Sequence, residues 1–197
     1  PFYTAYYDLG NTYRYMTCDP RNWDNSDLII VWGANPIENQ QRMGRHIVEA
    51  KANGGKIIDI GLLFDGTAGY ADEFVPVKPG SDAALSLCMA NHIVSNNLHQ
   101  PAYLLEHTVA PFLVRDDTNE FMRDGDGNYI VVDKQFGFIT ATPGVKAIEG
   151  ATELELEGAF EVFGVPCKTA FTRLKEHLAK YTPEYQETVT GVPAATA

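Results

Sequence analysis

Five residues suited to a negatively charged, hydrogen-bonding ligand lie in three short segments: Gly33 and Asn35, Gly61, and Gly80 and Asp82. A glycine lets a phosphate approach the backbone, an asparagine offers both donor and acceptor, and a carboxylate can accept two N–H donors from the edge of a guanine base. These residue types therefore suggest a nucleotide-binding site. Residue types alone give better support to the alternative, in which the glycines and asparagine only form turns and Asp82 is a first-turn helix charge.

Apolar runs predict the elements that would position these segments. Buried strands are expected at 27–33, 56–61 and 73–77, because each run is short, continuous and rich in β-branched residues. Helical spacing predicts one helix from Ile37 to Ala52, and a long helix from Pro79–Asp82 to Asn96. Strands that alternate with helices indicate a parallel, doubly wound sheet, in which ligands bind at the carboxyl ends of the strands.

The second half of the sequence predicts a hairpin between helices. A helix is expected over 101–107, a β-hairpin around Gly127-Asn128, a helix over 169–181 and a short helix ending at Gly191. The expected fold class is α/β, a Rossmann-like parallel sheet flanked by helices, with a β-hairpin insertion. We expect one domain over 1–197, made of a loop segment (1–25), a core (26–98), an insertion (108–168) and closing helices (169–193).

The charge balance argues against a nucleic-acid partner. Lysines and arginines number 15 against 26 aspartates and glutamates, which gives a net charge of −11 and repels a phosphate backbone. No apolar stretch reaches the length of a membrane span, and the amino terminus lacks the basic-then-apolar pattern of a signal peptide, so no membrane contact is expected from this chain.

Familiar metal and phosphate motifs are missing from the sequence. The three cysteines form no C-x-x-C pair, so they suit neither an iron-sulfur cluster nor a zinc site, and the five histidines have no ligand spacing. Neither G-x-G-x-x-G nor G-x-x-x-x-G-K-[ST] occurs. Asp124-Gly125-Asp126-Gly127-Asn128 imitates a calcium loop, but Tyr129 and Gln135 occupy its glycine and glutamate positions, so a hairpin tip is expected instead.

The order of several short motifs resembles the molybdopterin oxidoreductase family, the large subunits of the dimethyl sulfoxide reductase kind. These motifs are Trp23-x-Asn25-Ser26, Ile29-Ile30-x-Trp32-Gly33-x-Asn35, Ala71-Asp72 and Lys78-Pro79-Gly80-Ser81-Asp82. Trp-x-Asn before the first strand is similar to the branch with respiratory nitrate reductase, dimethyl sulfide dehydrogenase and ethylbenzene dehydrogenase. The tail from Phe171 to Pro193 is also similar to members of this branch.

The resemblance implies a bis(molybdopterin guanine dinucleotide) molybdenum cofactor held between two α/β domains, of which this chain would be one. Trp32, Gly33, Asn35 and Pro36 would then line the pyrophosphate and ribose; Asp82, in the Pro79-Gly80-Ser81-Asp82 loop, would bind the guanine edge. The parent enzyme would perform two-electron redox chemistry or oxygen-atom transfer on a small molecule.

The same resemblance implies that the chain is excised from a larger catalytic subunit and is inactive alone. Its partners would be the other domains of that subunit and an iron-sulfur electron-transfer subunit, since the parent's iron-sulfur cluster has no cysteine motif here. The family leaves the compartment open, and a periplasmic or membrane-associated parent in a prokaryote is the expectation.

Two segments bear on the cofactor in opposite ways. Residues 2–9 are similar to the stretch whose aspartate ligates molybdenum, which makes Asp8 the candidate catalytic and metal-ligating residue; the alternative is a solvated loop aspartate. Gly61-Leu62-Leu63 departs from the family, where many members have Asp-Pro-Arg, and Asp59 is two positions too early to replace that aspartate.

Two other functions therefore stay open. One is a non-catalytic interaction module that kept the fold and lost the cofactor. The other is an independent nucleotide-dependent enzyme, which lacks both a phosphate-loop pattern and an obvious proton-transfer pair.

Overall fold

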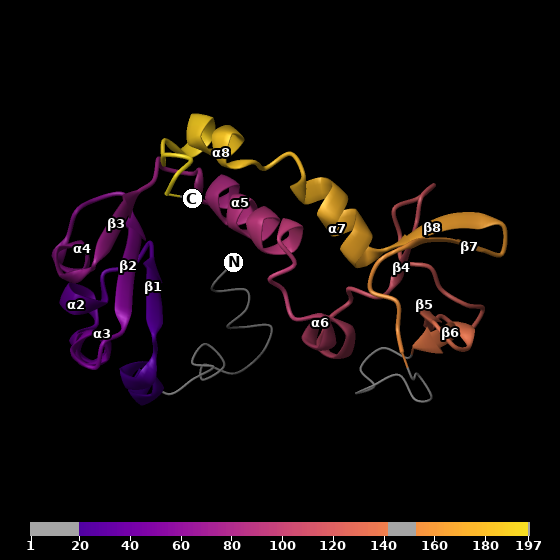
Figure 1. The fold of residues 1–197 in the computed structure, drawn as a ribbon, viewed down its shortest axis with the longest axis horizontal. Helices are drawn as coiled ribbons and strands as arrows, with labels where there is room; N and C mark the ends of the chain where they lie inside the picture. The colour runs from indigo at the N-terminus through magenta and orange to yellow at the C-terminus, as the bar shows by residue number, and fades with distance from the viewer. Residues whose placement is uncertain (1–19, 142–152, 197) are drawn as a thin grey trace. The chain divides into compact units, whose positions relative to one another are not determined.

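A computed structural model describes residues 20–141 and 153–196, and Figure 1 shows its helices and strands. These residues form two compact units. The first contains the described residues up to Asp82 together with Thr190–Val192, and the second contains Ala83–Val189 with the described residues from Pro193. The expectation of one domain over 1–197 stays a prediction, because compactness alone does not show whether the units unfold together.

The first unit is built on a parallel three-stranded sheet in the order β1-β2-β3. Its strands are β1 (Leu28–Trp32), β2 (Lys56–Gly61) and β3 (Glu73–Pro76), close to the predicted ranges. The 3-10 helix η2 (Pro20–Asn25) precedes β1, and the helices that flank the sheet are α2 (Pro36–Asn39), α3 (Gln41–Ala52) and α4 (Gly66–Tyr70) (Figure 1). The predicted α/β class, with a parallel sheet flanked by helices, is confirmed.

The core of this unit lies between the sheet and α3. Val31, Ile47 and Ile57 are buried there, and Trp23 packs against them. A carboxylate fixes the edge of this core: Asp72 Oδ2 accepts from the backbone N–H of Ile57 at 2.8 Å. That bond, with the neighbouring Lys51, lowers the pKa of Asp72. The Ala71-Asp72 motif thus has a structural role, in joining the start of β3 to β2.

The helix after β1 is divided, contrary to the sequence prediction of one helix up to Ala52. Gln40 separates α2 from α3 with φ −136° and ψ 60°. Gly44 lies so close to α2 that a Cβ there would be 2.9 Å from both Ile37 Cα and Pro36 O. The two helices therefore pack against one another, which a continuous helix would not allow.

Helix α4 lies between β2 and β3, where the sequence predicts neither a helix nor a strand. Its N-cap is Asp65, whose Oδ1 accepts from the backbone N–H groups of Thr67 (2.9 Å) and Ala68 (3.1 Å). Asp65 and Gly66 therefore start a short helix.

The second unit combines helices with two antiparallel sheets. Its helices are α5 (Asp82–Ser95), which begins at the last residue of the first unit, α6 (Pro101–His107), α7 (Ala170–Leu178) and α8 (Pro183–Thr190). One sheet has the order β4-β8-β7, from Leu113–Arg115, Val165–Thr169 and Ala159–Val162; the other is the hairpin β5-β6, from Tyr129–Asp133 and Gly137–Ala141. The predicted hairpin insertion is confirmed, but its turn lies at 134–136 rather than at Gly127-Asn128. The β4-β8-β7 sheet was not anticipated.

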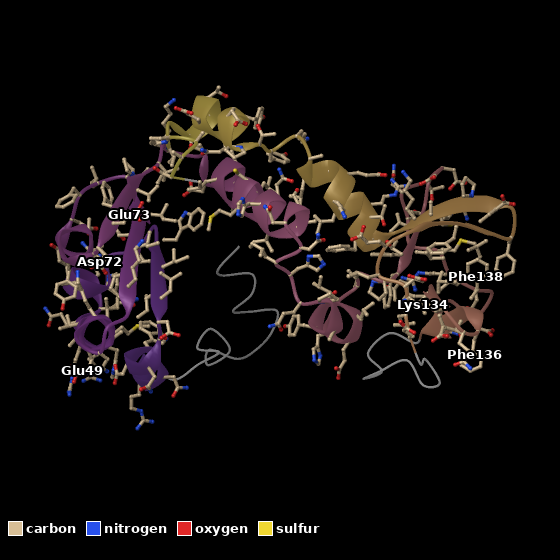
Figure 2. All side chains as sticks on the ribbon, in the orientation of Figure 1. Glu49, Asp72, Glu73, Lys134, Phe136 and Phe138 are labelled. Carbon is tan, nitrogen blue, oxygen red and sulfur yellow. The ribbon has the colours of Figure 1, made fainter. Side chains whose placement is uncertain are left out.

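The core beside these sheets contains Leu113, Met122, Ile130, Val132, Val162 and Cys167. Phe136 and Phe138 extend from the β5-β6 hairpin and are 60% and 50% exposed (Figure 2). Asp124 accepts from the backbone N–H groups of Asp126 (2.9 Å) and Asn128 (2.8 Å), so the segment that resembles a calcium loop forms a turn. Among the described helices, none has the length and apolar character needed to span a membrane.

Candidate functional site

The three predicted loops leave the sheet at one edge. All three strands are parallel, and their backbone hydrogen bonds continue just beyond the strand ends. The N–H of Gly33 donates to the carbonyl of Ile60 at 2.8 Å, and the N–H of Val77 donates to the carbonyl of Gly61 at 3.0 Å. This edge is the usual position of ligands in an open parallel sheet.

Two predicted site residues from different loops are in direct contact. Trp32, the last residue of β1, donates from its indole Nε1 to Oδ1 of Asp82 at 2.9 Å. Asp82 is exposed and is the first residue of the 14-residue helix α5, where the helix dipole favours negative charge. The loop after β1 and the loop after β3 are therefore joined by a side-chain hydrogen bond.

Two of the predicted glycines leave open space beside this bonded pair of loops. Gly33 and Gly80 have φ values of +61° and +75°, which residues other than glycine rarely adopt. A Cβ at either position would meet no heavy atom within 4 Å. Both backbones are thus accessible to a ligand that approaches closely.

The rest of the third loop is held by its own hydrogen bonds. Ser81 is buried and its hydroxyl donates to the carbonyl of Lys78 at 2.6 Å, whereas Pro79 is exposed. The backbone N–H of Lys78 donates to the carbonyl of Thr190 at 3.0 Å, so the last residue of α8 supports this loop.

Asn35 uses its amide within the protein. Its Oδ1 accepts from Thr67 Oγ1 at 2.8 Å and from the N–H of Glu38 at 3.3 Å, and its Nδ2 donates to Glu38 Oε2 at 2.6 Å. It is the N-cap of α2, and the buried Pro36 is the first residue of that helix. A ligand contact from Asn35 would have to share the amide oxygen with these partners.

The second loop presents an apolar surface at this edge of the sheet. After Gly61, the side chains of Leu62, Leu63 and Phe64 are 57%, 77% and 70% exposed. Phe64 contacts Phe74 edge to face, with ring centroids 5.3 Å apart. Asp65, the carboxylate of this loop, uses its Oδ1 as the N-cap of α4.

The buried carboxyl group of Asp59 lies close to Gly61. Asp59 is only 3% exposed, and a Cβ on Gly61 would be 3.7 Å from Asp59 Oδ2. Burial, together with the negative charge of Asp65, raises the pKa of Asp59 from its ordinary value of 3.8 to about 6. Its carboxyl therefore takes up a proton at mildly acidic pH.

Sequence reasoning missed the residues that hold the first two loops together. Glu38 and the fully buried Thr67 both bond to Asn35. A signal was present, because Asn35-x-x-Glu38 has the spacing of a capping box. Nothing in the local sequence indicates that Thr190 contacts Lys78, since that contact joins residues remote in the chain.

The predicted metal ligand, Asp8, lies outside the described residues. Within 20–141 and 153–196, no group of three or more His, Cys, Asp or Glu side chains could hold a metal ion. The metal-ligand assignment thus remains a prediction.

The three loops differ in the hydrogen-bonding groups that they offer to a ligand. A carboxylate has about four lone-pair sites, so Asp82 can accept from Trp32 and still accept two donors from a base edge. The open backbone at Gly33 and Gly80 and the exposed Lys78 suit phosphate oxygens. A ribose next to the second loop would find fewer hydrogen-bond partners, because Gly61 carries no side chain.

Comparison with known proteins gives one consistent family. A model of the family described as molybdopterin oxidoreductase matches residues 2–158. The alpha subunit of chlorate reductase from Ideonella dechloratans is 33% identical over 87% of this chain. The alpha subunits of dimethylsulfide dehydrogenase from Rhodovulum sulfidophilum and of respiratory nitrate reductase from Haloferax mediterranei are 29% and 30% identical over 95% and 96% of it.

The matches cover only a part of each relative. This chain spans 20%, 22% and 23% of the lengths of those three alpha subunits, respectively. The similarity therefore describes a region of about a fifth of a larger protein.

Proposed function

Because this chain belongs to the molybdopterin oxidoreductase family, we propose that it binds the guanine dinucleotide portion of a bis(molybdopterin guanine dinucleotide) molybdenum cofactor. The binding site is the shared edge at the carboxyl ends of β1, β2 and β3. In this proposal the chain is one domain of an oxidoreductase catalytic subunit.

The contact between Trp32 and Asp82 carries the proposal. Guanine presents two adjacent donors, N1–H and the 2-amino group, and a carboxylate accepts both with matching geometry. Adenine presents no such pair on its corresponding edge. An exposed carboxylate at a helix amino terminus, next to two open glycine backbones, therefore favours a guanine nucleotide.

The chain's residues would bind and orient the cofactor. Asp82 would hold the base, and Gly33, Gly80 and Lys78 would lie along the phosphates. When bound, the molybdenum-pterin group would supply two-electron redox chemistry or oxygen-atom transfer to a small-molecule substrate. Asp8 is proposed as a metal ligand on the similarity of residues 2–9 to the family segment, and metal analysis of an Asp8→Ala variant of the longer protein would test it.

The relatives named above are alpha subunits, which supports a larger assembly. We propose that the partners are the remaining domains of the same subunit and an iron-sulfur subunit that transfers electrons.

A second candidate is an interaction module that has lost the cofactor. The exposed Leu62, Leu63 and Phe64 favour it, because they form an apolar surface at the predicted binding edge. This candidate predicts no response to nucleotides.

Thermal unfolding with GMP, GDP and AMP at up to millimolar concentrations distinguishes the two. A ligand that binds the folded state stabilises it by RT ln(1 + [L]/Kd), so the proposal predicts a saturable rise in Tm with the guanine nucleotides and a smaller one with AMP. Asp82→Ala should abolish the guanine-selective part. Asp126→Ala, which removes an exposed carboxylate from the Asp124–Asn128 turn, is the matched control. Equal responses to GMP and AMP, or a normal GMP response in Asp82→Ala, would contradict the proposal.

A further inference from the structure

We infer that Trp32 is a positioning residue that orients the Asp82 carboxylate and thereby sets the selectivity of the site for guanine. This inference rests on the proposed guanine-binding function. It gives the Trp32 indole N–H a role other than the pyrophosphate and ribose contact that the family resemblance implies.

The two residues differ in how firmly the fold holds them. Trp32 is partly buried and pairs in the sheet with Ile60, so its backbone is fixed by the β1-β2 ladder. Asp82 is exposed, and an exposed aspartate side chain can adopt several rotamers. The 2.9 Å bond from Nε1 of Trp32 to Oδ1 selects among these rotamers.

The hydrogen-bonding capacity of each group explains why tryptophan suits this role. The indole N–H only donates, so it holds a carboxylate oxygen in place without competing for the donors of the base. Oδ1 has a second lone pair, and Oδ2 has two. The two acceptors that guanine needs are thus still available, and they are oriented before the base arrives, which reduces the entropy lost on binding.

Trp32→Phe tests this directly, because phenylalanine keeps an aromatic ring on the strand but removes the donor. Affinities for GMP, IMP and AMP would be measured by isothermal titration calorimetry on the wild-type chain and the variant. IMP keeps N1–H but lacks the 2-amino group, so the ratio of GMP to IMP affinity reports whether the second carboxylate acceptor is in place.

We expect Trp32→Phe to lower the GMP affinity by about tenfold, the IMP affinity by less and the AMP affinity little, which reduces the GMP-to-IMP ratio. If Trp32 had only a structural role, Trp32→Phe would lower the affinities for GMP, IMP and AMP by similar factors. An unchanged GMP-to-IMP ratio, in a variant that still binds GMP, would overturn the inference and leave the proposed function intact.

A second measurement needs no nucleotide. The protein has two tryptophans, so a ¹⁵N-labelled sample should show two indole N–H resonances, and Trp32→Phe assigns them. Asp82→Ala should shift the Trp32 resonance and leave that of Trp23 in place. An unmoved Trp32 resonance would overturn the positioning role even if GMP binds. A shifted resonance in a protein that binds GMP no better than AMP would overturn the proposed function, and the selectivity role with it.

Discussion

The indole Nε1 of Trp32 donates to Oδ1 of Asp82 at 2.9 Å, although the two residues are 50 positions apart in the sequence. The bond joins the end of β1 to the first residue of α5. Two of the three loops at the sheet edge are consequently linked in the protein alone, before any ligand is bound. The exchange of one donor or acceptor in this pair should therefore change ligand choice more than it changes the fold.

Asp82→Asn should change the base preference from guanine towards xanthine. An asparagine replaces one acceptor with a donor, which opposes the 2-amino group of guanine but matches the 2-oxo group of xanthine. We expect the affinity for GMP to fall by about tenfold or more and that for XMP to rise, because a buried or partly buried mismatch costs about 1–3 kcal/mol. Calorimetric titration with GMP and XMP measures both.

Asp82→Ala serves as the control for that exchange, since it offers neither a donor nor an acceptor. It should bind GMP and XMP equally weakly. A preference of Asp82→Asn for GMP as strong as that of the wild type would show that this side chain does not contact the base edge.

Stability should fall as the pH rises through about 6, because of Asp59. The pKa of this carboxyl is raised from 3.8 to about 6 by burial and by Asp65, so the folded chain keeps a proton that the unfolded chain releases above about pH 4. The stabilisation is fully present below about pH 4 and is lost as the pH rises to the folded-state pKa, with an amplitude of about 3 kcal/mol. Urea unfolding from pH 4 to 8 should show a smaller pH dependence in Asp59→Asn.

Asp65→Asn tests whether the negative charge of Asp65 helps to raise the pKa of Asp59. Asparagine is as good an N-cap as aspartate, so α4 should persist while the charge near Asp59 is removed. The fall in stability should then be complete at a lower pH and be smaller than in the wild type. If Asp59→Asn and the wild type have the same pH dependence, Asp59 does not titrate in this range.

Gly80→Ala should destabilise the first unit by about 1 kcal/mol, because alanine is strained at a φ of +75°. Gly125→Ala is the matched control, since its Cβ position is equally free of neighbours but its φ is not positive. Urea unfolding should show little change for Gly125→Ala. Equal effects of the two substitutions would mean that Gly80 is not strained in solution.

Gly44→Ala should cost about 1–3 kcal/mol by overpacking, although alanine is the better helix former. The added Cβ would lie 2.9 Å from Ile37 Cα, on a helix backbone that cannot move without displacing the Asn35 cap. Gly69→Ala, whose Cβ would make an ordinary 3.8 Å contact with Phe64, should be neutral or stabilising. An urea midpoint for Gly44→Ala at or above that of the wild type would show that α2 and α3 are not closely packed.

The sequence predicts the parallel sheet well, because a local apolar run marks each strand. The apolar runs around Val31, Ile57 and Val75 end in turn residues, and their buried positions in the structure match the runs. The positions of the three loops follow from the strands, since parallel strands bring their carboxyl ends to one edge. The contact of Asp82 with Trp32 could not be predicted, because no local rule links the end of a strand to a side chain 50 positions away.

Other elements depend on tertiary packing that a sequence pattern does not reveal. The break at Gln40 follows from the close approach of Gly44 to Ile37, which a helical periodicity cannot show. In the β4-β8-β7 sheet, Leu113 of β4 pairs with Thr169 of β8. These two strands are far apart in the sequence and are three and five residues long. A three-residue strand with a remote partner carries little periodicity, so β4 was missed. Strands β7 and β8 form a local hairpin, and the glycine of its Phe163-Gly164 turn was the signal that sequence reasoning overlooked.

The contact between Lys78 and Thr190 makes the first unit discontinuous along the chain. Residues Thr190–Val192 belong to that unit, and Val192 is fully buried, yet the whole stretch from Ala83 to Val189 comes before them in synthesis. During translation, more than a hundred residues are therefore synthesised between the loop from Lys78 to Asp82 and Thr190, which accepts the hydrogen bond from Lys78. The hydrogen bond that joins this loop to Thr190 thus forms only after residues 83–189 have been synthesised.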